Sequence, residues 1–223
     1  MRKFKIYDLI IGILFTVLFI SIAVIITINF RPLYYLDVRL LNIEANSGLA
    51  KAEILRNYNA LIDYCSPFFG GDLVFPTLTA SPSGLYHFVQ VKQIFTFFYF
   101  LGAGTLIIGI ITIIRKTKAK DYSYLFASAI MSIVLPAILG ILIALNFDRT
   151  FILFHKIVFR NNDWLFDPAT DPVITILPEA FFMHCAVMII CIVILLSILF
   201  LVVYFSKKKN TGIKYRKNNG LKF

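Results

Sequence analysis

Histidine is the side chain in this sequence best suited to moving protons near neutral pH, because its ordinary pKa is about 6.5. His87 and His155 lie in polar segments between long apolar runs, and His184 stands at the start of the last run. Aromatic residues surround the first two in sequence, and an apolar setting shifts the pKa of an imidazole. His87 and His155 are therefore candidates for moving protons, with a purely structural role for both as the alternative.

A metal site built from all three histidines is the alternative. The separations between the histidines match no common set of metal ligands. A histidine such as His184, at the start of an apolar run, is more often satisfied within its own helix. We expect no metal ion and no other cofactor.

Cysteine and other nucleophile chemistry has little support in the sequence. Cys65 lies in a polar segment, Cys185 and Cys191 lie in the last apolar run, and no CxxC spacing occurs. Cys65 could be a nucleophile or a disulfide partner of Cys185, but we favour a small apolar core residue. The sequence has no HExxH, no GxSxG and no phosphate-binding glycine loop.

Four apolar runs indicate that these polar segments belong to a membrane protein. The chain is 59% hydrophobic and only 15% charged, unlike a soluble domain. The first run is longer than the apolar part of a signal peptide and precedes the bulky NFRPLYY, so we interpret it as a retained helix. The sequence predicts one all-α membrane domain, residues 1–223, with spans of about 20 residues at about 6–28, 94–114, 123–146 and 182–205.

Lysine and arginine gather beside one set of ends of these spans. The two termini and the link between the second and third spans carry 14 basic residues, whereas segments 29–93 and 147–181 carry 8 basic and 10 acidic residues. The positive-inside rule then places both termini in the cytoplasm and both long segments outside the cell. The net charge of +10 therefore needs no nucleic-acid partner. The tail, 206–223, either touches anionic lipid headgroups or only sets the topology.

The two outer segments must form an extracellular cap over the four-helix bundle, mostly helical and possibly with short strands. YLDVRLLNI, residues 35–43, could be a short strand or an interfacial segment, and Ser47 could cap a helix that runs to Cys65. Ser81 followed by Pro82 is typical of a helix start. That helix should pass through His87 into the second span.

The second outer segment is expected to hold His155 on a short helix. Asp148 could cap this helix, in which Phe151, Phe154 and His155 share one face. Prolines follow at positions 168, 172 and 178 and restrict the backbone. We therefore expect an ordered lid rather than a slack linker.

The stretch FHKIVFRNNDWLFDPATDPVITILPEAFF, residues 154–182, resembles the hallmark segment of the lipoprotein intramolecular transacylase family of Gram-positive bacteria. The shorter stretches NYNALIDY and HFVQVKQIF, which begin at Asn57 and His87, resemble other segments of that family. Together with the layout of four spans, the resemblance covers nearly the whole chain. One position departs from the pattern, because many relatives have an acid before the Val-Lys pair where this chain has Gln90.

The resemblance implies an acyltransferase that works within one lipoprotein molecule. The sn-2 acyl chain of an S-diacylglyceryl group moves to the α-amino group of the N-terminal cysteine and gives the lyso-form lipoprotein. In such an enzyme His87 and His155 are the catalytic pair at the boundary between cap and membrane. The implied partners are diacylglyceryl lipoproteins and the cell membrane, and the oligomeric state is left open.

Acid–base chemistry by two histidines suits that reaction. The attacking amine must lose a proton, since an α-amino group has a pKa of about 7.7–8, and the leaving glyceryl oxygen must gain one. The cyclic intermediate is eight-membered, so orientation by the site should supply much of the rate. No covalent enzyme intermediate and no ATP are needed.

The sequence leaves open which histidine is the base. We favour His155, because Asp163 and Asp167 follow it and can orient its ring, although both acids can instead make turns. Trp164 could be a pocket wall or a membrane anchor. Candidates for binding the substrate or its oxyanion, or for supporting the site, are Asn57, Tyr58, Arg160, Asn162 and Trp164.

Two other functions remain open at the level of sequence. A non-catalytic cap protein that binds lipid or lipoprotein would keep its function after His87 and His155 are replaced. A metal-dependent lipid hydrolase would lose activity when a chelator is added.

Overall fold

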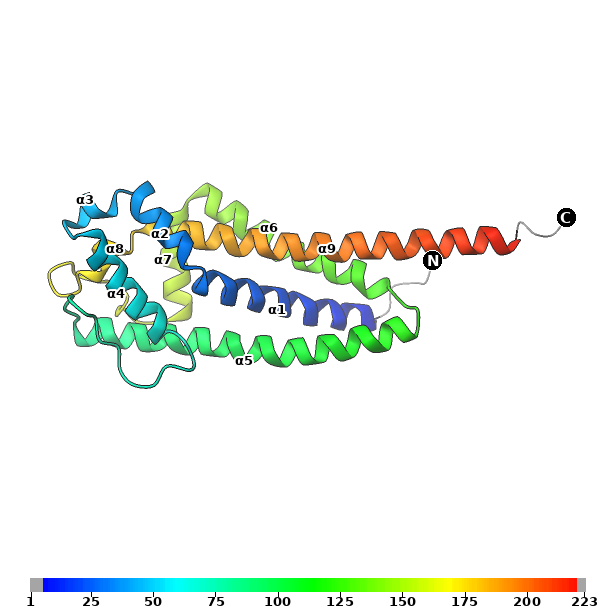
Figure 1. Cartoon of the computed structure of the whole chain (residues 1–223), viewed down its shortest axis with the longest axis horizontal. Helices are drawn as coiled ribbons and strands as arrows, with labels where there is room; N and C mark the ends of the chain where they lie inside the picture. The colour runs from blue at the N-terminus through cyan, green and yellow to red at the C-terminus, as the bar shows by residue number, and fades with distance from the viewer. Residues whose placement is uncertain (1–5, 220–223) are drawn as a thin grey trace. The chain divides into compact units, whose positions relative to one another are not determined.

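The computed structural model describes residues 6–219, and helix is the only regular secondary structure in that range. Arg2, Lys3, Lys5 and Lys222, which were used to predict the topology, lie outside the described residues. Figure 1 draws the helices from blue to red in chain order. They are α1 (Ile6–Asn29), α2 (Arg31–Leu40), α3 (Ile43–Ser47), α4 (Lys51–Tyr64), α5 (Pro82–Lys118), α6 (Ser123–Leu145), α7 (Phe147–Val158), α8 (Val173–Ile176) and α9 (Glu179–Asn219).

The all-α prediction is confirmed, and the possibility of a short strand at residues 35–43 is wrong. Most of that stretch lies in α2, whose buried residues are Tyr34, Asp37 and Val38. These residues recur at three- and four-residue spacing, so they bury one face of a helix, whereas a strand would bury alternate residues.

Four of the helices, α1, α5, α6 and α9, are long and apolar enough to cross a membrane. Two of them extend well beyond the spans predicted from sequence. The α5 helix begins at Pro82, and α9 continues to Asn219 through the segment expected to be a tail. Lysine and arginine, which fill much of this last part, are good helix formers.

Two helix starts differ from the sequence prediction. Ser47 ends α3 instead of capping α4, whose N-cap is Ala50. Asn146 caps α7 in place of Asp148, because the side chain of Asn146 accepts a hydrogen bond from the backbone N–H of Arg149. Asn and Asp are about equally good caps, so the sequence alone could not choose between the two.

The chain divides into two compact units. The first, called the bundle unit, contains Met1–Ile22, Leu101–Leu139 and Ile190–Phe223 as far as these are described. The second, called the histidine unit, contains Ala23–Phe100 and Gly140–Ile189.

In the bundle unit, α1 packs closely against three other helices. Phe15 of α1 contacts the rings of Tyr124 and Phe200, with centroids 5.9 and 4.9 Å away. A Cβ atom on Gly109 of α5 would lie 3.3 Å from the Phe15 ring, and the hydroxyls of Thr16 and Ser132 are 3.0 Å apart. Small residues and hydroxyl pairs of this kind are how membrane helices pack together.

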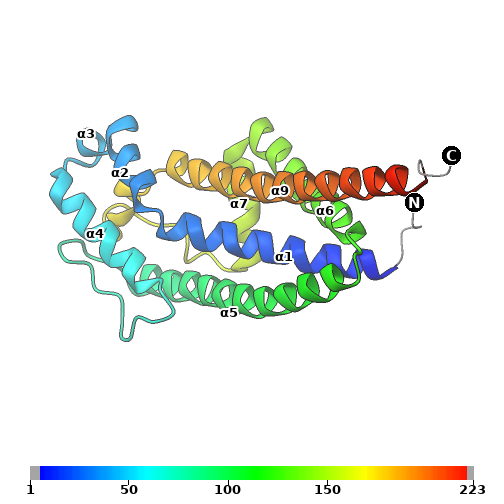
Figure 2. The ribbon, with the colours of Figure 1, turned by 45° about the vertical axis from the view of Figure 1, so that its right-hand side comes forward.

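Aromatic stacking forms the core of the histidine unit. The rings of Tyr34 and Tyr58 stack with centroids 3.6 Å apart, and Phe181 meets the Tyr34 ring edge-on at 5.0 Å. The hydroxyl of Tyr34 donates a hydrogen bond of 2.7 Å to the carbonyl of Ile176. These contacts tie α2, α4, α8 and the start of α9 together, and Figure 2 shows α2, α3 and α4 gathered side by side.

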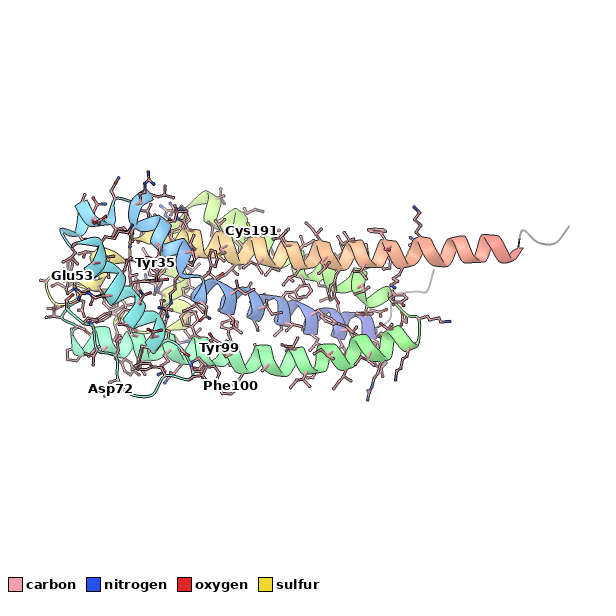
Figure 3. All side chains as sticks on the ribbon, in the orientation of Figure 1. Tyr35, Glu53, Asp72, Tyr99, Phe100 and Cys191 are labelled. Atoms are coloured by element: carbon pink, nitrogen blue, oxygen red, sulfur yellow. The ribbon has the colours of Figure 1, made fainter. Side chains whose placement is uncertain are left out.

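Polar contacts at the surface of the same unit reinforce this core. Tyr35 and Arg31 of α2 both donate to the side-chain oxygen of Asn59 at 2.9 Å, and Arg31 also pairs with Asp63. Tyr99 of α5 accepts a hydrogen bond of 2.6 Å from Asn29 at the end of α1. Tyr35 and Tyr99 are both labelled in Figure 3.

His184 is satisfied within the fold, as predicted, but by a partner from another helix. Its Nδ1 lies 2.9 Å from both carboxylate oxygens of Asp37. Asp37 is only 1% exposed. The pair therefore joins α2 to α9 and keeps a buried carboxylate from being left alone.

Candidate active site

The structure brings His87 and His155 together. His87 comes from the second turn of α5 and His155 from the last turn of α7, and the centroids of their rings are 5.9 Å apart. The Ser81–Pro82 start predicted for α5 is confirmed, since the Ser81 hydroxyl accepts a hydrogen bond from the backbone of Gly84. The two side chains, called the histidine pair below, are 5% and 8% exposed.

His87 is enclosed by aromatic rings. Phe159 and Phe166 meet it edge-on, with centroids 4.5 and 5.5 Å away. Its Nδ1 is buried and has no hydrogen-bond partner among the described residues. Burial, and then the charge that His155 can carry, lower the pKa of His87 to about 4. His87 is therefore neutral at physiological pH.

The tautomer of His155 is set by its own helix. Its Nδ1 lies 2.8 Å from the backbone carbonyl of Phe151, one turn earlier. A carbonyl oxygen can only accept, so Nδ1 carries the hydrogen and Nε2 keeps its lone pair. Burial lowers the pKa of His155 and the hydrogen bond to Phe151 opposes that shift. Nε2 is therefore ready to accept a proton at neutral pH.

The structure gives the His155 ring a hydrogen-bond partner other than Asp163 or Asp167, namely the Phe151 carbonyl. Within residues 6–219, neither carboxylate is hydrogen bonded to the ring. The carboxylate of Asp167 accepts from the backbone of Ala169 at 2.9 Å, which is the turn-making alternative. The sequence does not reveal this partner, because the acceptor is the backbone carbonyl of residue 151, which any residue type would supply.

Trp164 forms a wall of the site. Its ring lies 4.8 Å from the His155 ring, and its Nε1–H donates a hydrogen bond of 2.8 Å to the carbonyl of Asn161. Trp164 is 9% exposed. The contact with the His155 ring favours Trp164 as a pocket wall over Trp164 as a membrane anchor. Because the indole N–H already donates to the Asn161 carbonyl, it is a poor candidate for binding an oxyanion.

Two further candidates from the sequence lie in the turn after α7. Arg160 is exposed, has a positive φ of 57° and reverses the chain after α7, and its Nε donates to the carbonyl of Ile157. Asn162 is also exposed, and its backbone carbonyl accepts a hydrogen bond from the backbone N–H of Leu165. Their geometry is that of a turn that returns the chain toward Trp164.

Asn57 and Tyr58 support the fold of the histidine unit rather than its reacting groups. The buried amide of Asn57 donates to Thr77 Oγ1 at 2.7 Å and accepts from the Thr77 backbone at 3.2 Å. Tyr58 lies in the aromatic stack with Tyr34, and burial raises the pKa of its hydroxyl. Both side chains hold α4 against its neighbours.

Sequence reasoning missed Asn161 and left the role of Gln90 open. Asn161 donates a hydrogen bond of 3.0 Å from Nδ2 to Oε1 of Gln90 in α5. Gln90 thus provides a hydrogen-bond acceptor at the position where an acid was expected from the resemblance. Because two asparagines are adjacent, the sequence alone could not show that Asn161, rather than Asn162, makes this contact.

A second missed residue, Asp171, fixes the start of α5. Its buried carboxylate accepts from the backbone N–H of Ser81 at 2.7 Å and from the Thr170 hydroxyl at 2.8 Å. A Cβ atom on Gly84 would lie 2.2 Å from this carboxylate, so only glycine fits there. Asp171 thereby holds the loop that carries Phe166 against the helix that carries His87.

Cys65 takes the role of a small core residue. It is 3% exposed, and burial raises the pKa of its thiol to about 12, which disfavours a nucleophilic thiolate. Cys65 and Cys185 are both free thiols, so the possible disulfide between them is absent. The described part of the chain brings no three His, Cys, Asp or Glu side chains together as a metal site.

Comparison with known proteins identifies close relatives. The family model for "Lipoprotein intramolecular transacylase Lit" matches residues 9–182. A solved structure of the membrane integral lipoprotein intramolecular transacylase Lit from Bacillus cereus has 37% sequence identity and a TM-score of 0.90, covering 92% of this chain and 96% of that one. None of the curated proteins matches the chain.

Two further structures are of the same Bacillus cereus protein with one histidine replaced. The arginine variant has 36% identity and a TM-score of 0.84, covering 93% of this chain and 92% of that one. The alanine variant has the same identity and TM-score, covering 92% of this chain and 94% of that one.

Proposed function

The chain belongs to the lipoprotein intramolecular transacylase family, and we propose that the histidine pair transfers an acyl chain within a diacylglyceryl lipoprotein. The sn-2 acyl chain leaves its glyceryl oxygen and joins the α-amino group of the N-terminal cysteine, giving the lyso-form lipoprotein. The observation that carries this proposal is the histidine pair itself, two neutral imidazoles 5.9 Å apart in an aromatic enclosure.

His155 is the general base in this proposal. Its Nε2 lone pair takes a proton from the α-amino group as the amine nitrogen bonds to the ester carbonyl carbon. The Phe151 carbonyl accepts from Nδ1 and stabilises the imidazolium that results. This supports the choice of base made from the sequence, but with a backbone carbonyl in place of the two acids.

His87 is the general acid. As the bond between the acyl carbon and the sn-2 oxygen breaks, a ring N–H of His87 gives its proton to that oxygen. In the same step the other ring nitrogen of His87 accepts the proton that His155 took from the amine, so His87 passes through no imidazolate. Nδ1 of His87 has no hydrogen-bond partner among the described residues and is free to serve as one end of this transfer. No net proton is consumed, and both imidazoles end neutral.

The aromatic enclosure supplies positioning and excludes water. Phe159 packs against both histidines, at 4.5 Å from the His87 ring and 5.3 Å from the His155 ring. A site walled in this way favours a folded substrate whose amine and ester meet. For well-oriented groups such positioning contributes up to about 7–11 kcal/mol to lowering the barrier. Water kept out of the site cannot hydrolyse the ester instead.

The proposed topology has four spans, with segments 29–93 and 147–181 outside the cell and both termini in the cytoplasm. The exposed Arg115 and Lys118 at the end of α5, and the exposed Lys207 just beyond the apolar part of α9, fit a cytoplasmic surface. The single lipoprotein substrate and the surrounding bilayer are the proposed partners.

Alanine replacement tests this function. Purified His87→Ala and His155→Ala variants should each lower kcat at least about 100-fold, the usual contribution of a positioned acid or base, on a synthetic diacylglyceryl lipopeptide. Lys156→Ala, an exposed neighbour on α7, should keep the wild-type rate. Full activity in either histidine variant would leave only a binding role for the site.

A further inference from the structure

Asn161 joins two parts of the histidine unit through three hydrogen bonds. Its side-chain amide donates to Gln90 Oε1 of α5 at 3.0 Å. Its side-chain oxygen accepts from the backbone of Asp163 at 3.2 Å, and its backbone carbonyl accepts from Trp164 Nε1 at 2.8 Å. One residue thus connects α5 with the loop that follows α7.

Each end of this connection lies next to one member of the histidine pair. Gln90 comes three residues after His87 on α5, so the two side chains share one face of the helix. At the other end, Trp164 packs 4.8 Å from the ring of His155. The hydrogen bond between Gln90 and Asn161 is therefore a polar link between the element that holds His87 and the wall behind His155.

We propose that the Gln90–Asn161 hydrogen bond is a positioning element that holds the histidine pair at its reactive separation. Neither residue touches the substrate; both act through the histidines. The proposal rests on the proposed function, in which the two imidazoles must reach different atoms of one folded substrate. A displacement of about 1 Å in such a site lowers the rate about 100-fold.

The expected effects on stability and on kcat distinguish this positioning role from a purely structural one. One partly buried neutral hydrogen bond contributes only a small part of the free energy of unfolding. Both side chains are half-buried and lie outside the aromatic core of the unit. Loss of the bond should therefore leave the fold intact and show itself in kcat.

Four variants test the link. Asn161→Ala and Gln90→Met each remove it, and each should lower kcat about tenfold to 100-fold with KM changed less than about threefold. The double variant should be no slower than the slower single variant, because both changes remove the same bond. Gln90→Glu keeps a hydrogen-bond acceptor on a side chain of the same length, so this variant should retain most of the wild-type kcat. Gln93→Met, exposed on the same helix, is the matched control and should match wild type.

Three results would overturn the proposal. They are a wild-type kcat in both single variants, losses that add up in the double variant, and a rate that falls only in step with the thermal unfolding midpoint. Failure of the proposed function would look different, since the wild-type protein itself would then form no N-acyl product.

Discussion

At the scale of single residues, the chemistry of the site is decided by what surrounds each imidazole. His155 has a fixed tautomer because the Phe151 carbonyl accepts from its Nδ1, and His87 is neutral because it is buried among aromatic rings. In the proposed function, the same residue type therefore takes two roles in one site.

The pKa of His155 predicts the pH dependence of the reaction. The base works only when neutral, and burial holds the pKa of His155 below its ordinary 6.5. Measured on saturating lipopeptide, kcat should fall between pH 8 and pH 7 only as far as protonation of the substrate α-amino group requires, since that group has a pKa of about 7.7–8. Protonation of His155 should add a further fall only below about pH 6.5. A loss of kcat between pH 8 and pH 7 larger than the amine alone produces would contradict this assignment.

The depressed pKa of His87 predicts a pH-dependent stability. With a folded pKa of about 4 against an ordinary 6.5, His87 binds fewer protons in the folded than in the unfolded state between those values. The contribution of neutral His87 to the free energy of unfolding is therefore fully present above pH 6.5. As the pH falls toward 4, the free energy of unfolding decreases by about 3 kcal/mol.

Thermal unfolding in detergent at pH 7 and pH 4.5 measures this effect. His87→Phe should lose part of the acid destabilisation that wild type shows, while Lys156→Ala should keep all of it. An equal fall of the unfolding midpoint in all three proteins would contradict the prediction.

How far the sequence predicts the site depends on which atoms make each contact. His87 and His155 were recognisable, because their residue type and their place between apolar runs both indicate proton transfer. The carbonyl of Phe151 was not, because a backbone atom leaves no mark on residue type. The roles of Gln90 and Asn161 depend on a contact between residues far apart in the chain, which spacing along one helix does not show.

At the scale of elements, the start of α5 determines where His87 stands. Ser81 and Pro82 signalled this start in the sequence, because capping is local and depends on residue type. The contact of Gly84 with Asp171 is long-range, and no local pattern predicts it.

Gly84→Ala should destabilise the protein. The new methyl group would lie 2.2 Å from the Asp171 carboxylate, and such overpacking destabilises by about 1–3 kcal/mol. Gly104→Ala on the same helix is the matched control, since nothing lies within 4 Å of its added Cβ. Thermal midpoints should fall for the first variant and stay level or rise for the second; the reverse order would contradict the account.

The contact between His184 and Asp37 leads to a second prediction at this scale. Replacing His184 by alanine leaves the Asp37 carboxylate buried without its partner, which should destabilise by about 2–3 kcal/mol. The Asp37→Asn, His184→Ala double variant should lose less than the two single variants together. Additive losses in the thermal midpoint would show that α2 and α9 are not joined by this pair.

At the scale of the whole molecule, the number and position of long apolar helices were predictable, because the apolar runs are long and the charges lie between them. The division into two compact units and the extension of α9 to Asn219 were not. Both depend on packing and helix continuation beyond the apolar runs, where composition is no guide.

The topology can be tested by labelling single cysteines in intact cells. A membrane-impermeant maleimide should label Asn46→Cys directly but label Lys118→Cys only after the cells are permeabilised, because the positive-inside rule places these sites on opposite faces. Both native positions are exposed and therefore accessible to the reagent. The opposite pattern would place segments 29–93 and 147–181 in the cytoplasm.

The most direct test of the central claim is tandem mass spectrometry of a diacylglyceryl lipoprotein with a heavy isotope in its sn-2 chain, before and after incubation with the purified protein. The transfer is an isomerisation, so the parent mass should stay constant while the heavy acyl chain appears on the fragment with the cysteine amine. A parent lighter by one acyl chain would indicate a hydrolase. A heavy chain still on the glyceryl fragment would contradict acyl transfer altogether.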